Sequence, residues 1–171
     1  AHLKDEGMIA TSEIATKIAD FTYSKYMRDT RQALKDFDDG KDSMLIDDMV
    51  NMNIMLTGMV SDLSTGGKQL AVAHNFYDAV CCMYKDVRRK YLHGEIVAMA
   101  LPLQLAVNGS PEAEIEELKA FLREVGIPVS IREAGVPQDG LEELITYVHR
   151  VTIPDDMELL EQIRDGFKYI M

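Results

Sequence analysis

Apolar residues recur at intervals of three and four along nearly the whole chain, which is the pattern of amphipathic helices. In the first third of the chain, this pattern predicts one helix over residues 11–37 and a second over residues 43–62. The Asp- and Gly-rich stretch 36–42 between them predicts a turn. The second helix carries a run of methionines whose spacing is typical of a core stripe: Met49, Met52, Met55 and Met59.

The rest of the chain also predicts helices, with one short exception. Residues 129–131, Val-Ser-Ile, are the one candidate strand. The helix predicted over residues 96–107 is apolar on nearly all sides, so other helices must surround it, and Pro102 predicts a kink within it. The other predicted helices span residues 71–90, 112–125, 141–151 and 155–169.

These elements predict an all-α fold, a bundle of roughly seven helices in one domain over residues 1–171. We expect its helical core at about residues 11–126 and its C-terminal helices at about residues 137–171. Hydrophobic residues make up 47% of the chain, enough to bury a core, and no apolar run is long enough to span a bilayer. The composition therefore indicates a soluble globular protein.

Charge and cysteine content narrow the classes of partner and compartment. The formal net charge is 18 − 29 = −11, and so acidic a surface repels phosphate backbones, which argues against nucleic-acid binding. The only two cysteines are the neighbours Cys81 and Cys82, which point in different directions on a helix and indicate core packing. Adjacent free cysteines and the absence of a signal peptide predict a cytoplasmic location.

Two of the four histidines are candidates for chemistry. His74 lies in an apolar stretch and His93 directly precedes the buried helix, whereas His2 is terminal and His149 fits a structural role. A metal ion is one reason to bring two imidazoles together, because it repays the cost of removing them from water. The alternative is a pair of core histidines bonded to backbone carbonyls.

An open catalytic metal site with two histidines also needs an anionic ligand. The local candidates are Glu13, in the first turn of the first helix, and Glu95, two residues after His93. Glu95 fits better as the cap of its own helix. Other catalytic motifs are lacking: the chain has no phosphate-binding loop, dinucleotide fingerprint or nucleophile elbow.

Two stretches of the chain resemble a known family. Residues 65–74 read TGGKQLAVAH and residues 91–98 read YLHGEIVA. In the iron-containing alcohol dehydrogenase superfamily, a glycine loop similarly leads to an Ala-rich helix with one metal-binding histidine, and a later His-Gly-Glu carries the second. Within that superfamily the chain is most similar to the helical half of glycerol dehydrogenases. Tyr77 departs from the pattern, since glycerol dehydrogenases often have another histidine there.

The resemblance implies a dehydroquinate-synthase-like α-domain in which Glu13, His74 and His93 bind zinc or iron. It assigns no catalytic residues beyond these ligands. The ion would polarise the hydroxyl of an alcohol or polyol such as glycerol, for hydride transfer to NAD(P). The resemblance covers about half of a family member and leaves out the N-terminal nucleotide-binding domain, so we expect this chain to be inactive alone. Family members are commonly homo-oligomers.

Two alternatives stay open at this point. One is the helical half of a lyase like dehydroquinate synthase, the sister family that uses glutamate at the position of Glu13. The other is a non-catalytic helical interaction domain with a vestigial site. Metal analysis of the purified protein distinguishes the lyase half from the interaction domain, because a non-catalytic interaction domain should contain no stoichiometric metal.

Overall fold

The computed structural model describes residues 10–64 and 71–171 and contains no strand among them. The predicted all-α class is therefore confirmed for this part of the chain. Four of the seven predicted helices are single helices, the other three are each divided into two, and α9 is an additional helix that was not predicted. The described residues thus form eleven α-helices. They are α1 (Ala10–Asp38), α2 (Met44–Asn51), α3 (Thr57–Leu63), α4 (Val72–Met83), α5 (Lys85–Lys90), α6 (His93–Met99), α7 (Leu101–Val107), α8 (Glu112–Glu124), α9 (Ile131–Ala134), α10 (Leu141–Thr152) and α11 (Met157–Gly166), with the π-helical turn η1 (Met52–Leu56) and the 3₁₀ turns η2 (Gln138–Gly140) and η3 (Phe167–Tyr169).

The internal contacts group the chain into two compact units, residues 1–69 and residues 70–171. The single domain over residues 1–171 stays a prediction. In the described part of either unit, no helix has the length and apolar character that a membrane crossing requires.

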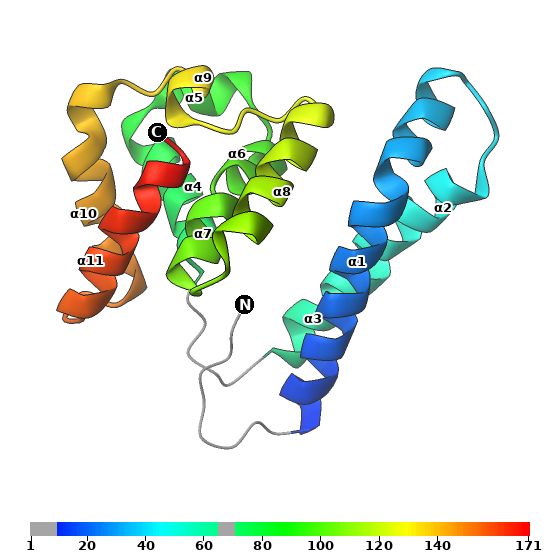
Figure 1. The fold of residues 1–171 in the computed structure, drawn as a ribbon, viewed down its shortest axis with the longest axis horizontal. Coiled ribbons are helices and arrows are strands. Elements are labelled where there is room, and N and C mark those ends of the chain that lie inside the picture. Colours follow the sequence, from blue (N-terminus) through cyan, green and yellow to red (C-terminus); the bar gives the residue numbers. More distant parts are fainter. Residues whose placement is uncertain (1–9, 65–70) are drawn as a thin grey trace. The chain divides into compact units, whose positions relative to one another are not determined.

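The first unit is a helical hairpin in which α1 packs against α2, η1 and α3 (Figure 1, blue to cyan). The predicted turn is confirmed: α1 ends at Asp38, and Gly40 adopts a positive φ of 65° that favours glycine. Ser43 then caps α2, because its hydroxyl accepts the Leu45 N–H at 3.3 Å.

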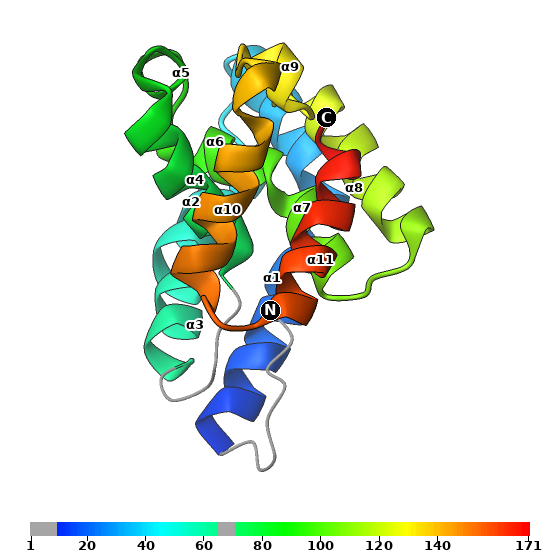
Figure 2. The same cartoon turned by 90° about the vertical axis from the view of Figure 1, so that its left-hand side faces the viewer.

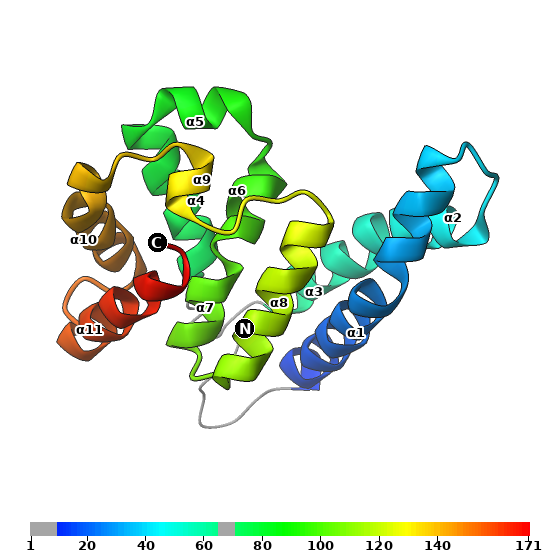
Figure 3. The same cartoon turned by 45° about the horizontal axis from the view of Figure 1, so that its top comes forward.

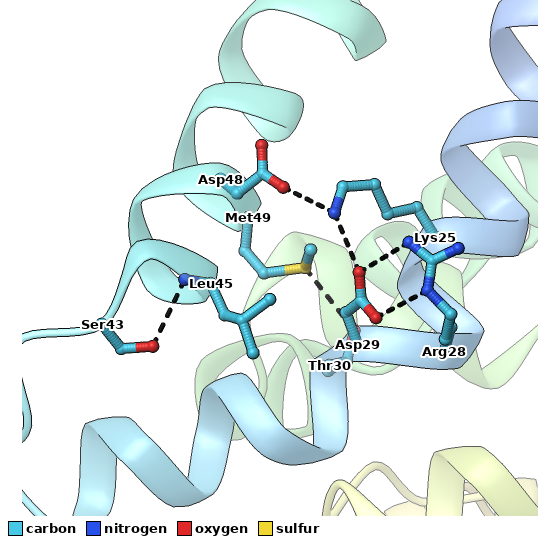
Figure 4. A network of polar contacts seen from close by, with 8 residues as sticks. All are labelled: Lys25, Arg28, Asp29, Thr30, Ser43, Leu45, Asp48 and Met49. Carbon is cyan, nitrogen blue, oxygen red and sulfur yellow. Dashed lines mark hydrogen bonds and ion pairs between the residues drawn. The ribbon is translucent and has the colours of Figure 1, made fainter.

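An ion-pair network links the two sides of this hairpin (Figure 4). Lys25 of α1 lies 2.8 Å from Asp29 and 2.5 Å from Asp48 of α2, and Arg28 donates to Asp29 as well. Hydrogen bonds from Arg28 and Lys25 hold the pKa of Asp29 well below its usual range. The network therefore depends on an ionised Asp29.

The predicted methionine core stripe is wrong for two of its four members, because Met49 is half-buried and Met52 buried but the other two are exposed. Met55 and Met59 are 61% and 44% exposed. The reason is the π-helical turn η1, in which the Thr57 N–H bonds to the Met52 carbonyl five residues back. A π turn shifts the phase of the helix, so residues within it and after it, such as Met55 and Met59, are displaced from the face that they would occupy in a regular 3.6-residue repeat.

The second unit is built around α4, α6 and α7, with α10 packed on α4 and α11 on α7 (Figures 1 and 2). The predicted central helix is buried as expected, with Ile96, Met99 and Leu103 almost fully enclosed. It is not one kinked helix but two, α6 and α7, divided at Ala100. Pro102 lacks an N–H and cannot continue the hydrogen bonding of α6, but it fits the first turn of α7.

The candidate strand at residues 129–131 is also wrong, because Ser130 begins a helix. The Ser130 hydroxyl accepts the Glu133 N–H at 3.1 Å, and the Glu133 carboxylate accepts the Val129 N–H at 2.9 Å. This exchange resembles a capping box, whose Ser-x-x-Glu signature was present in the sequence and outweighs the β-propensity of its apolar neighbours.

Candidate metal centre

The burial of α4 turns His74 outward. Val72, Ala73 and Phe76 are buried in the core of the second unit, which leaves His74 and Tyr77 on the opposite side of the helix, one turn apart. The first turn of α4 is held by α7, since the Ala73 N–H donates to the Gln104 side chain at 3.2 Å. Sequence reasoning missed Gln104, because nothing in the local pattern shows which helix end its amide will reach.

His93 is the first residue of α6, and a cap fixes its position. The Glu95 carboxylate accepts the Leu92 N–H at 2.6 Å, directly before His93. The prediction that Glu95 caps its own helix is therefore confirmed. Figure 3 shows α5 joining the end of α4 to the segment that leads into α6, so the chain from His74 to His93 doubles back on itself.

The two histidines lie side by side although 19 positions separate them in the sequence. Their ring centroids are 5.6 Å apart and the ring planes are inclined by 50°. A zinc–nitrogen distance of about 2.0–2.1 Å puts each ring centroid about 3.2 Å from the ion, so two imidazoles on one tetrahedral ion have centroids about 5.2 Å apart. The observed pair is close to that separation, so these donors fit a divalent cation.

The alternative of two core histidines is wrong, because both His74 and His93 are exposed. His149 shows what a core histidine looks like here: it is 7% exposed, and its Nε2 donates to the Asp156 carbonyl at 2.7 Å. The structural role predicted for His149 is therefore confirmed. His2 lies outside the described residues.

The third predicted ligand, Glu13, is an exposed residue in the first turn of α1. It belongs to the first unit and the histidines to the second, so a common site for all three stays a prediction. Over residues 10–64 and 71–171, no group of three or more His, Cys, Asp or Glu side chains is gathered closely enough to hold an ion.

Tyr77 completes the surroundings of His93. Its ring meets the His93 ring edge-on, with centroids 4.3 Å apart and planes at 78°. A hydrogen bond with Cys81 and partial burial raise the pKa of the Tyr77 hydroxyl, while the nearby Arg88 guanidinium lowers it. The tyrosine ring therefore packs against one member of the histidine pair.

The cysteines are not core residues, contrary to the prediction. Cys81 is half-buried beside Tyr77, and Cys82 is exposed, with its sulfur 3.5 Å from the Tyr147 hydroxyl. Neither cysteine belongs to the buried face of α4 formed by residues such as Phe76 and Val80.

The fold and the histidine pair define a class of protein: an all-α domain that presents two imidazoles at one surface. Over 82 residues, 48% of its length, the chain is 33% identical to the glycerol dehydrogenase of Thermotoga maritima (strain ATCC 43589 / DSM 3109 / JCM 10099 / NBRC 100826 / MSB8). This stretch is 21% of that protein. No protein-family profile matches the chain.

Among solved structures, the fold matches a probable glycerol dehydrogenase from Sinorhizobium meliloti 1021 with a TM-score of 0.73 and 23% identity. The match covers 91% of this chain and 44% of that one, so the chain spans less than half the length of either protein. Together the two comparisons confirm the resemblance: in sequence and in fold, the chain is like glycerol dehydrogenases of the iron-containing alcohol dehydrogenase superfamily.

Proposed function

We propose that this chain is the metal-binding helical half of an NAD-dependent alcohol or polyol dehydrogenase acting on a glycerol-like substrate. Its ligands are His74, His93 and Glu13, and its ion is zinc or iron. The observation that carries the proposal is the exposed histidine pair, whose 5.6 Å centroid separation suits one tetrahedral ion. The similarity to two glycerol dehydrogenases supports the reaction class.

The roles of the residues follow from their surroundings. His74 and His93 would each supply a ring nitrogen as ligand, and Glu13 would supply a carboxylate that offsets the charge of the ion. A bound divalent cation supplies a Lewis acid that favours the alkoxide form of the substrate hydroxyl. Because both histidines are exposed, a small alcohol can approach this side of α4 without displacing core residues.

Two contacts hold the histidines in place for this task. Gln104 fixes the start of α4 at Ala73, one position before His74, and Glu95 fixes the start of α6 at His93. Both are single hydrogen bonds to otherwise free N–H groups at helix ends. Because the helices that carry them are capped, the two histidines are held in position before the ion binds, so binding costs little conformational entropy.

The test is zinc binding by the full chain, measured by calorimetry and by metal analysis of the purified protein. We expect stoichiometric metal in the parent chain and a loss of zinc affinity of about a hundredfold in His93→Ala, since even outer-shell changes cost up to that much. Leu92→Ala is the matched control, because Leu92 is the adjacent residue and 75% exposed. Equal zinc affinities for His93→Ala and the parent chain would refute the proposal. A parent chain without metal would instead favour the non-catalytic interaction domain.

A further inference from the structure

The ring of His93 needs a support that the backbone of α6 does not supply. His93 is the first residue of this short helix, and its side chain is exposed. The Glu95 cap fixes where the helix begins, but it does not fix the side-chain torsions of His93. In the described part of the chain, no hydrogen bond or ion pair holds the His93 ring. Metal-binding histidines usually donate their second ring N–H to a carboxylate or carbonyl, which orients the ring, so this ring depends on packing instead.

Tyr77 of α4 supplies that packing. Its ring meets the His93 ring edge-on, and the 4.3 Å between their centroids is shorter than the 5.6 Å between the rings of His93 and His74. An edge-to-face arrangement is one that aromatic rings prefer. His93 therefore contacts two rings of α4 that are three positions, or about one helical turn, apart.

Tyr77 is itself anchored, so it can serve as a fixed support. It is half-buried and packs against the hydrophobic core of the second unit, which includes Phe76 and Val80 of the same helix. A tyrosine has only two side-chain torsions, so it loses little conformational entropy when it is ordered. The exposed His93 ring thus lies against a side chain that the core already holds.

We infer that Tyr77 is a positioning residue that holds the His93 ring beside His74, so that both histidines can bind one ion. The inference rests on the proposed function and deepens it. Without the tyrosine ring, His93 can adopt other rotamers, and the ion must select the productive one. The apparent affinity then falls by the same factor as the productive fraction. Because the contact is made by the ring, phenylalanine should replace tyrosine without loss.

The experiment compares zinc binding by the parent chain, Tyr77→Leu and Tyr77→Phe, measured by calorimetry on the full chain. We expect Tyr77→Leu to weaken zinc binding about fivefold, which corresponds to the energy of one aromatic pair, and Tyr77→Phe to match the parent chain. Tyr147→Leu is the matched control, because Tyr147 is half-buried against the same core but its ring contacts Arg150 rather than a histidine.

Two spectroscopic measurements test the position of the ring directly. The visible spectrum of the cobalt(II)-loaded chain reports the ligand geometry, and it should change in Tyr77→Leu but not in Tyr77→Phe or Tyr147→Leu. In the metal-free parent chain, nuclear Overhauser contacts should join the rings of Tyr77 and His93. This second measurement requires no variant to fold, and the absence of such contacts would overturn the inference.

The variants can overturn it in three further ways. Tyr77→Leu may equal the parent chain in zinc affinity, or it may lose no more affinity than Tyr147→Leu, which would show a general effect of core packing. A loss in Tyr77→Phe as large as that in Tyr77→Leu would assign the role to the hydroxyl. The His93→Ala variant separates the two levels. If the parent chain binds no zinc, or His93→Ala binds it equally well, the proposed function fails and this inference fails with it. If His93→Ala loses zinc and Tyr77→Leu does not, this inference alone fails.

Discussion

The contact between Tyr84 and Gly140 permits a double-mutant test of the packing that holds α5 in place. Tyr84 is the residue between α4 and α5, and its hydroxyl is buried without a hydrogen-bond partner among the described atoms. Burial raises its pKa, and the carboxylates of Glu143 and Asp139 raise it further. Tyr84→Phe removes this unsatisfied group, so the free energy of unfolding should rise by about 1 kcal/mol.

Gly140→Ala should act in the opposite direction. A Cβ added at Gly140 would overlap the Tyr84 hydroxyl oxygen and lie 3.2 Å from the Cζ of the ring. The φ of Gly140 is −92°, so alanine causes no backbone strain, and the cost comes from displacing the tyrosine, about 1–3 kcal/mol. In the Tyr84→Phe background the overlapping atom is gone, and the remaining cost should be under about 1 kcal/mol.

Urea denaturation followed by far-ultraviolet circular dichroism measures the four free energies of the parent chain, the two single variants and the double variant. We expect a coupling energy of at least about 1 kcal/mol, because the two residues are in direct contact. Additive effects of the two substitutions would refute the reasoning, since they would place the Tyr84 hydroxyl away from Gly140. A destabilised Tyr84→Phe would likewise show that the hydroxyl has a bonding partner.

Two further predictions concern the polar contacts of the helices. Because the pKa of Asp29 is lower in the folded chain than in the unfolded chain, its ion pairs add stability that is complete above about pH 4 and is lost as the pH falls toward the folded value. Asp29→Asn should therefore flatten the acid side of the stability–pH curve measured by urea denaturation, and an unchanged curve would count against the network. Ser130→Ala removes the cap of α9 and should lower the free energy of unfolding by about 1 kcal/mol, whereas Thr146→Ala, an exposed change in α10, serves as its control.

The local patterns in the sequence predicted most of the helices. The apolar periodicity located α1, α8, α10 and α11 closely, since each is amphipathic and ends near turn-forming residues. The predictions from apolar periodicity were wrong at two places where a specific local hydrogen bond outweighed the average hydrophobic pattern. The π turn at Met52 moved two methionines to the surface, and the serine cap at Ser130 produced a helix where β-branched residues suggested a strand.

For the candidate site, the sequence by itself predicted which residues would carry the chemistry. The two histidines, the His-Gly-Glu segment and the capping role of Glu95 are local features and could be recognised from neighbouring residues. The tertiary structure decided what local patterns do not contain: that His74 and His93 are exposed with ring centroids 5.6 Å apart, and that the Tyr77 ring lies edge-on against His93. The physical reason is that these contacts form only when α4, α5 and α6 pack around a common core, and the direction of each turn depends on that packing.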